Sequence, residues 1–149
     1  MKSIFNKSDN DELVGRINKL TASSATQWGK MNVSQMMVHA REPFRVAFGE
    51  LKLERSLVGI LFGSIAKKKL LSDRPFGRNL PTDKHFIVRD NPDFETERNR
   101  LVAIVKRCAE QGAGAFTTAP HPFFGKLTSE EWDALLWKHL DHHLQQFGA

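Results

Sequence analysis

The sequence predicts an all-α fold, an antiparallel four-helix bundle with a helical insertion and long irregular connections. Three observations favour this class. Apolar residues recur at the three- and four-residue spacing of helices, capping-box pairs precede several of these stretches, and Pro/Gly-rich or irregular segments separate them. Helices of this kind bury their apolar stripes against one another. We expect one domain over residues 1–149, a length typical of a domain with its own core.

The first expected helix begins after Asp9, with Glu12 in the capping-box position, and runs to about Leu20. The small polar stretch 21–26 ends or loosens it. A second helix opens at Asn32, where Gln35 is the reciprocal cap partner.

An apolar and basic segment, 51–71, follows the second helix. Residues 57–71 fit an amphipathic helix that packs into the core, and they also fit a helix that lies on a membrane surface. We prefer the core helix, which needs fewer assumptions. The Pro/Gly-rich connection 72–92 is long for a bundle and should lie over its surface, with a short extended piece at 86–88.

The third main helix is expected from about Asp93 to Gln111, ending near Gly112. An irregular stretch then leads to Thr128. Its partner Glu131 completes another capping box and sets the start of the last helix.

Composition places the protein among ordinary globular chains, with 40% hydrophobic and 26% charged residues. The N-terminus lacks the apolar core of a signal peptide, and the longest apolar run, 57–66, is far short of the roughly 20 residues of a membrane-spanning helix. The chain has one cysteine, Cys108, so it cannot form an internal disulfide. This fits a reducing cytoplasm, where we expect the protein to reside. Cys108 lies on an apolar helical stripe, so we interpret it as a packing residue.

The net charge of +5 is concentrated in one region. Residues 51–89 contain nine Lys or Arg and three Asp or Glu. Such a region could attract a polyanion, an acidic membrane surface or an anionic cosubstrate. The run Lys67 to Lys69 is more typical of a solvated helix end than of a phosphate clamp, so we expect neither specific nucleic-acid binding nor a membrane partner.

Two histidines lie in the apolar stripe of the last helix. At about 100° per residue from Trp132, His139 falls at about 340° and His143 at about 20°, between Leu135 and Leu136. Buried imidazoles need partners for their ring nitrogens. The spacing fits a shared metal ion, and it fits equally two core histidines with separate hydrogen bonds.

A third histidine, His39, falls on the flank of the second helix's stripe, where it could reach a groove between helices or remain at the surface. Three neutral imidazoles would suit zinc, nickel or another divalent ion and leave a position for water or substrate. Gln35, one turn before His39, is a candidate to orient it.

Two parts of the chain carry a family pattern, at residues 28–39 (WGKMNVSQMMVH) and, near the C-terminus, at 121–128 (HPFFGKLT), Glu131-Trp132 and 138–148 (KHLDHHLQQFG). They closely resemble the DinB-like superfamily, in the branch called domain of unknown function 1569. The resemblance implies a four-helix bundle in which His39, His139 and His143 hold a divalent metal, and relatives that are often dimers. One departure is that many relatives follow the last ligand with Arg-Gly-Gln, whereas this chain has Leu144-Gln145-Gln146, so a substrate role of that arginine does not carry over.

The resemblance also implies a range of functions. Characterised members of the wider superfamily include transferases and isomerases that use low-molecular-weight thiols, so an enzyme that activates water or a thiol is one expectation. A metal-stabilised module without catalysis is the alternative. His142 is interpreted as a non-ligand. His121 could be a fourth ligand or an acid/base group, but we prefer a role in ordering the loop that enters the last helix.

Overall fold

The computed structural model describes residues 2–72 and 74–149, and this part of the chain is helical with no β-strand. The all-α prediction is therefore confirmed. Its elements are α1 (Lys7–Lys19), α2 (Val33–Ala47), α3 (Leu57–Leu70), the 3₁₀ turn η1 (Lys84–Phe86), α4 (Phe94–Gln111), the 3₁₀ turn η2 (Ala113–Ala115) and α5 (Ser129–Gln146).

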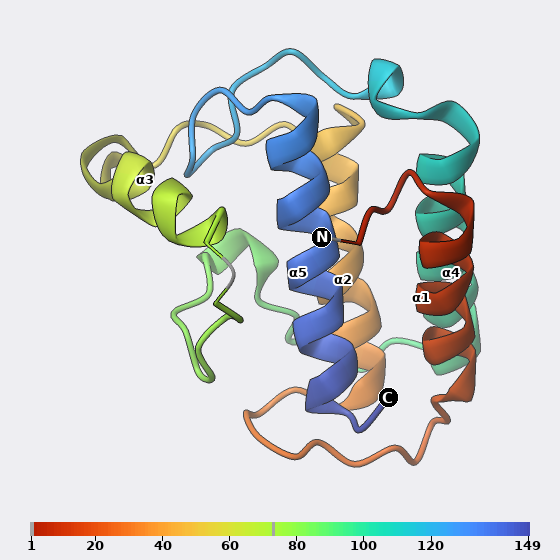
Figure 1. The fold of residues 1–149 in the computed structure, drawn as a ribbon. Coiled ribbons are helices and arrows are strands. Elements are labelled where there is room, and N and C mark those ends of the chain that lie inside the picture. The colour runs from red at the N-terminus through yellow and green to blue at the C-terminus, as the bar shows by residue number, and fades with distance from the viewer. Residues whose placement is uncertain (1, 73) are drawn as a thin grey trace.

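Four of the helices lie side by side, and α3 stands apart from them beside α5 (Figure 1). Helices α1 and α2 each contact both α4 and α5. The core between them is apolar, and each of the four helices contributes side chains that are fully buried, among them Ile17, Phe44, Leu101 and Leu136. This arrangement is compatible with a helical bundle.

Two predicted capping boxes set the starts of the helices that carry the histidines. In α2, the Asn32 side chain accepts from the backbone N–H of Gln35 at 2.8 Å, and the Gln35 side chain accepts from the N–H of Asn32 at 3.0 Å. Thr128 and Glu131 form the same reciprocal pair at the start of α5. Both predictions are confirmed, and they fix the helical register of the candidate ligands.

The predicted start of the first helix is wrong by about one turn. Helix α1 begins at Lys7 because the Asn6 side chain caps it, accepting from the backbone N–H of Asp9 at 3.1 Å. Glu12, expected in a capping box, instead pairs with Lys2. Asparagine and aspartate are about equally good N-caps, so the sequence alone does not choose between Asn6 and Asp9. In the structure the cap is Asn6.

The prediction that residues 57–71 form a core helix is also wrong. Helix α3 forms, but only Gly59, Gly63 and Leu70 of it are buried, and most of its large apolar side chains are exposed. Glycines supply the packing face, so no wide apolar stripe is left for the core. No helix in the described part of the chain is long and apolar enough to cross a membrane.

The connection after α3 contacts the middle of α5 and the first half of α2. The Lys138 ammonium donates to the carbonyl oxygens of Leu70 at 2.6 Å and of Ser72, which holds the start of this connection against α5. Of the extended piece expected at 86–88, Phe86 instead ends η1, while Ile87 has extended backbone angles and donates its N–H to the Lys84 carbonyl at 3.4 Å; none of the three residues belongs to a strand. This turn brings the Phe86 carbonyl to His39.

Candidate metal centre

His39, His139 and His143 lie together where α2 contacts α5. Their ring centroids are 4.6 to 5.0 Å apart, and one candidate ligand nitrogen from each lies within 4.8 Å of the others. His39 and His143 are buried, whereas His139 is partly exposed. The structure thus brings together all three candidate ligands, and His39 lies inside the packed interface rather than on its flank.

The Nε2 atoms of His39 and His139 have a separation that fits a shared ion and also fits a hydrogen bond between the two rings. Nε2 of His39 lies 3.2 Å from Nε2 of His139. Two imidazoles on one tetrahedral ion, with metal–nitrogen distances of about 2.0–2.1 Å, hold their nitrogens about 3.3–3.4 Å apart. The pair therefore fits a common ion with little adjustment of either ring.

The partner of the other His39 nitrogen fixes which nitrogen can bind metal. Nδ1 of His39 lies 2.9 Å from the carbonyl oxygen of Phe86. A carbonyl oxygen only accepts, so Nδ1 carries the proton and Nε2 presents its lone pair. Metal-bound histidines are commonly oriented by such a bond from their second nitrogen.

Gln146 orients His143 in the same way. Nδ1 of His143 lies 2.7 Å from the Oε1 atom of Gln146, whose Nε2 donates to the Trp28 carbonyl at 2.7 Å. Because the amide nitrogen is committed to Trp28, its oxygen faces the imidazole and accepts from it. Nε2 of His143 is thereby left free to bind a cation.

His139 has the one buried ring nitrogen of the cluster without a partner. Its Nδ1 is buried and makes no hydrogen bond to a described residue, while its Nε2 is the atom that faces His39. A buried polar atom without a partner is costly. A metal ion at Nε2 would use the nitrogen that faces the cluster, and it would leave the Nδ1–H without an acceptor among the described residues.

Burial keeps the three imidazoles neutral. It lowers the pKa of His39, lowers that of His143 to about 3, and holds the pKa of His139 well below its usual range. The neighbouring histidines contribute in the same direction for His139 and His143, because protonated rings would repel each other. Neutral imidazole is the form that binds a metal ion, so the cluster is ready to do so near pH 7.

His121 lies outside this cluster, in the loop before α5. Its Nδ1 accepts from the backbone N–H groups of Phe123 at 3.0 Å and Phe124 at 3.2 Å, and its backbone pairs with Gly125. These contacts support the interpretation that His121 orders the loop. Burial lowers its pKa to about 4.

The other candidate side chains also have separate environments. His142 lies outside the cluster, between Trp28 and Phe76, with ring centroids 5.6 and 6.1 Å away. The Gln35 side chain completes its capping box and donates to the Asp90 carbonyl at 3.1 Å, so it does not orient His39. Cys108 is fully buried, and burial raises its pKa to about 12, in agreement with a packing role.

The groups that orient the ligands are those that sequence reasoning missed. Gln146 follows His143 by three residues on the same helix, so helical spacing could have identified it. The Phe86 contact uses a backbone carbonyl from a long connection, and no residue type signals such a contact. Within the described residues the group of potential ligands is His39, His139 and His143 alone, a three-nitrogen set that leaves a position for water or substrate.

Comparison with known proteins identifies the family. The model of the family described as "Protein of unknown function (DUF1569)" matches residues 4–149, nearly the whole chain. No curated protein and no solved structure gives a significant match. The chain therefore belongs to the DUF1569 family.

Proposed function

We propose that this protein is a divalent-metal-binding, DinB-like antiparallel four-helix bundle, and that its three-histidine centre serves an enzyme that activates water or a low-molecular-weight thiol. Zinc and nickel are the metals best suited to three neutral imidazoles. The observation that carries the proposal is the convergence of His39, His139 and His143, with the second nitrogens of His39 and His143 already held by oxygen atoms.

The residues of the chain prepare this site in three ways. The Phe86 carbonyl and the Gln146 amide hold protons on the Nδ1 atoms of His39 and His143, which aims both Nε2 lone pairs into the cluster. Burial excludes water from these two rings, and the Nδ1 atom of His139 is buried as well. A divalent ion held there would supply a Lewis acid that brings the pKa of a coordinated water to about 7 or deprotonates a thiol.

A pocket next to the centre supports a small-molecule substrate. Its volume is about 190 Å³, and its lining includes the rings of Trp28, Phe76 and His142, the cations Arg78 and Lys138, and the carboxylate of Asp141, which is paired with Arg16. The Arg78 guanidinium lies over the Trp28 ring, 4.2 Å from its centroid. The His142 ring adjoins that of His143, with centroids 5.2 Å apart, so an anionic molecule in this pocket would lie beside the cluster.

Elemental analysis of the purified protein tests the metal site. We expect about one divalent ion per chain, lost in His39→Ala and in His143→Ala and retained in the control His85→Ala. His85 is an exposed histidine that pairs with Asp83 outside the cluster. Wild-type protein that takes up no zinc or nickel, or a His39→Ala variant that keeps it, would refute the proposal.

A metal-stabilised module without catalysis is the alternative, and it has some structural support because the ligands join two core helices. It predicts that His139→Ala chiefly lowers the melting temperature, since metal affinity would appear as folding energy. The enzyme predicts that the metal-loaded wild-type protein turns over a member of a panel of thiols and electrophiles, and that His139→Ala does not. Failure of the loaded wild-type protein on a panel that a related thiol transferase turns over would favour the module.

A further inference from the structure

We propose that one face of α3 docks onto an anionic membrane surface. This α3 face consists of the large apolar residues of the first two and a half turns of the helix: Leu57, Val58, Ile60, Leu61, Phe62 and Ile65. The proposal is independent of the metal centre, and it concerns a helix that lies on a membrane without crossing it.

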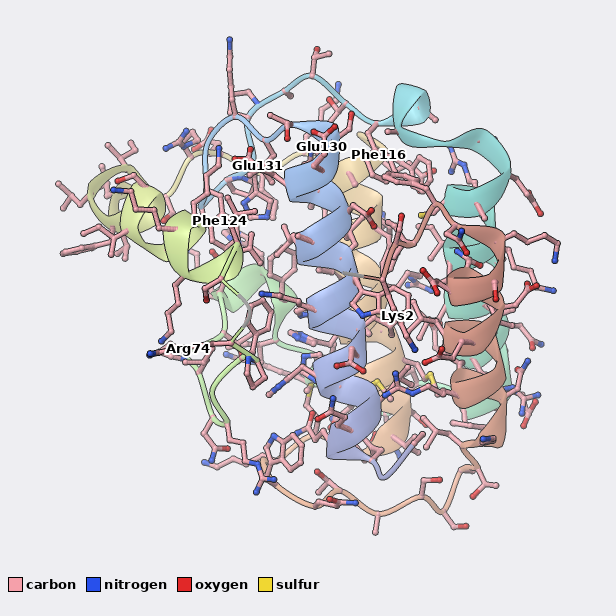
Figure 2. All side chains as sticks on the ribbon, in the orientation of Figure 1. Lys2, Arg74, Phe116, Phe124, Glu130 and Glu131 are labelled. Atoms are coloured by element: carbon pink, nitrogen blue, oxygen red, sulfur yellow. The ribbon has the colours of Figure 1, made fainter. Side chains whose placement is uncertain are left out.

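The α3 face is far more exposed than apolar side chains of a stable core. Leu57 is 78% exposed, Leu61 70% and Phe62 55%. Six large side chains at such exposures form a patch on the order of 600 Å², at the upper end of what monomeric proteins present to water. In Figure 2 the side chains at the outer end of this helix project away from the rest of the molecule. An exposed apolar patch of this size marks a site of interaction with another protein or with a membrane.

The opposite face of α3 explains why the apolar side chains point outward. Gly59 and Gly63 pack so closely on the 122–124 loop that a Cβ atom on Gly59 would lie 2.6 Å from the Phe123 carbonyl oxygen, and one on Gly63 would overlap the same oxygen. The backbone N–H of Ser56 donates to the Pro122 carbonyl at 3.0 Å. A helix that packs through glycines presents its bulky side chains on the side away from the contact.

A second contact holds the other end of α3. Lys67 donates to the Lys126 carbonyl at 2.8 Å and pairs with Glu131 of α5 at 2.7 Å. The helix is thus attached at both ends to the segment that leads into α5, and its orientation is fixed. The α3 face therefore belongs to a helix that is held in a defined position, and not to a loosely attached segment.

The charges around the α3 face select an anionic partner. Lys68 and Lys69, in the last turn of the helix, are exposed and form no ion pair with a described residue. Helix α3 has no acidic residue, and the segment just before it carries two basic residues, Lys52 and Arg55, and one acidic residue, Glu54. Apolar side chains with lysines at their border are the arrangement of helices that lie in the interface of anionic bilayers, where the apolar groups enter the acyl boundary and the ammonium groups meet lipid headgroups.

A second copy of the chain fits this face less well. Two α3 faces packed together would bring two copies of the 51–89 region into contact, each with nine basic and three acidic residues. No acidic side chain on either α3 would offset the repulsion. Charge complementarity thus favours an anionic bilayer over self-association.

Vesicle co-sedimentation of the full-length protein tests the proposal. We expect binding to vesicles that contain phosphatidylglycerol and phosphatidylcholine, and binding at least about tenfold weaker to phosphatidylcholine alone or at high salt. Leu61→Glu and Phe62→Glu should each weaken binding by about tenfold or more, because they place a charge in the inserted face. The control Ala103→Glu adds the same charge at an exposed position of α4 and should bind like the wild type.

Circular dichroism would check that each variant is folded. Sedimentation equilibrium without lipid would give the oligomeric state. Wild-type protein that binds no anionic vesicle overturns the proposal, as does a Leu61→Glu variant that binds as well as the wild type. A dimer that Leu61→Glu dissociates would assign the α3 face to a second copy and would equally overturn it.

Discussion

Replacement of Gln146 by leucine tests whether this side chain prepares His143 as a metal ligand. Gln146 is almost completely buried, and its side chain joins two groups: its oxygen accepts from Nδ1 of His143 at 2.7 Å, and its nitrogen donates to the Trp28 carbonyl at 2.7 Å. Leucine has a similar volume but no polar atom. The His143 ring would lose the contact that fixes its protonated nitrogen and its orientation.

Loss of an orienting hydrogen bond of this kind typically lowers metal affinity by about 10- to 100-fold, or about 1.4–2.7 kcal/mol. The Trp28 carbonyl and the His143 Nδ1–H would also become unpaired, so the free energy of unfolding should fall by about 1–3 kcal/mol. We expect Gln146→Glu to retain most of the metal affinity, because a carboxylate still accepts from Nδ1.

Competition with a chromophoric chelator, on protein first stripped of metal, measures these affinities. The matched control is Gln145→Leu, which removes an exposed amide that donates only to Asp141 at 2.7 Å. Its metal affinity should equal that of the wild type. The account of the site is refuted if folded Gln146→Leu binds metal as tightly as the wild type, or if Gln145→Leu loses as much affinity.

Three further predictions concern the fold. Leu136→Ala removes a fully buried side chain and should lower the free energy of unfolding by about 2–5 kcal/mol in urea titrations, whereas a loss below about 1 kcal/mol would mean that the site is not well packed. Burial lowers the pKa of His121 to about 4, below its value of about 6.5 in the unfolded chain, so the unfolded state binds more protons between these values and stability falls as the pH drops through them. From pH 7.5 to pH 5 the wild type should therefore lose about 2 kcal/mol more than His121→Asn, which keeps an acceptor but cannot titrate, and equal losses would contradict this. Gly63→Ala should displace α3 through overlap with the Phe123 carbonyl and speed proteolysis within residues 57–70, while unchanged cleavage would show that the contact is loose.

The parts of the fold that local chemistry determines could be predicted from the sequence. The capping boxes of Asn32 with Gln35 and Thr128 with Glu131 depend on residues three apart, and both are present. The inward direction of His139 and His143 follows from helical spacing alone, and the structure places both beside His39.

Two features that the sequence did not predict correctly depend on contacts between distant segments. Helix α3 was expected in the core because its composition is apolar, but glycines at 59 and 63 form its contact with the 122–124 loop. The Phe86 carbonyl reaches His39 across 47 positions of sequence, and a backbone atom carries no residue-specific signal. The start of α1 failed for a local reason, since Asn6 and Asp9 are equally good caps and only one can be used.

The central claim is that three imidazoles bind one ion, and X-ray absorption spectroscopy of the zinc-loaded protein tests it most directly. We expect three imidazole nitrogens at about 2.0–2.1 Å and one further light-atom ligand. A first shell that contains sulfur, or fewer than two imidazoles in the wild type, would contradict the assignment of His39, His139 and His143 as the metal ligands.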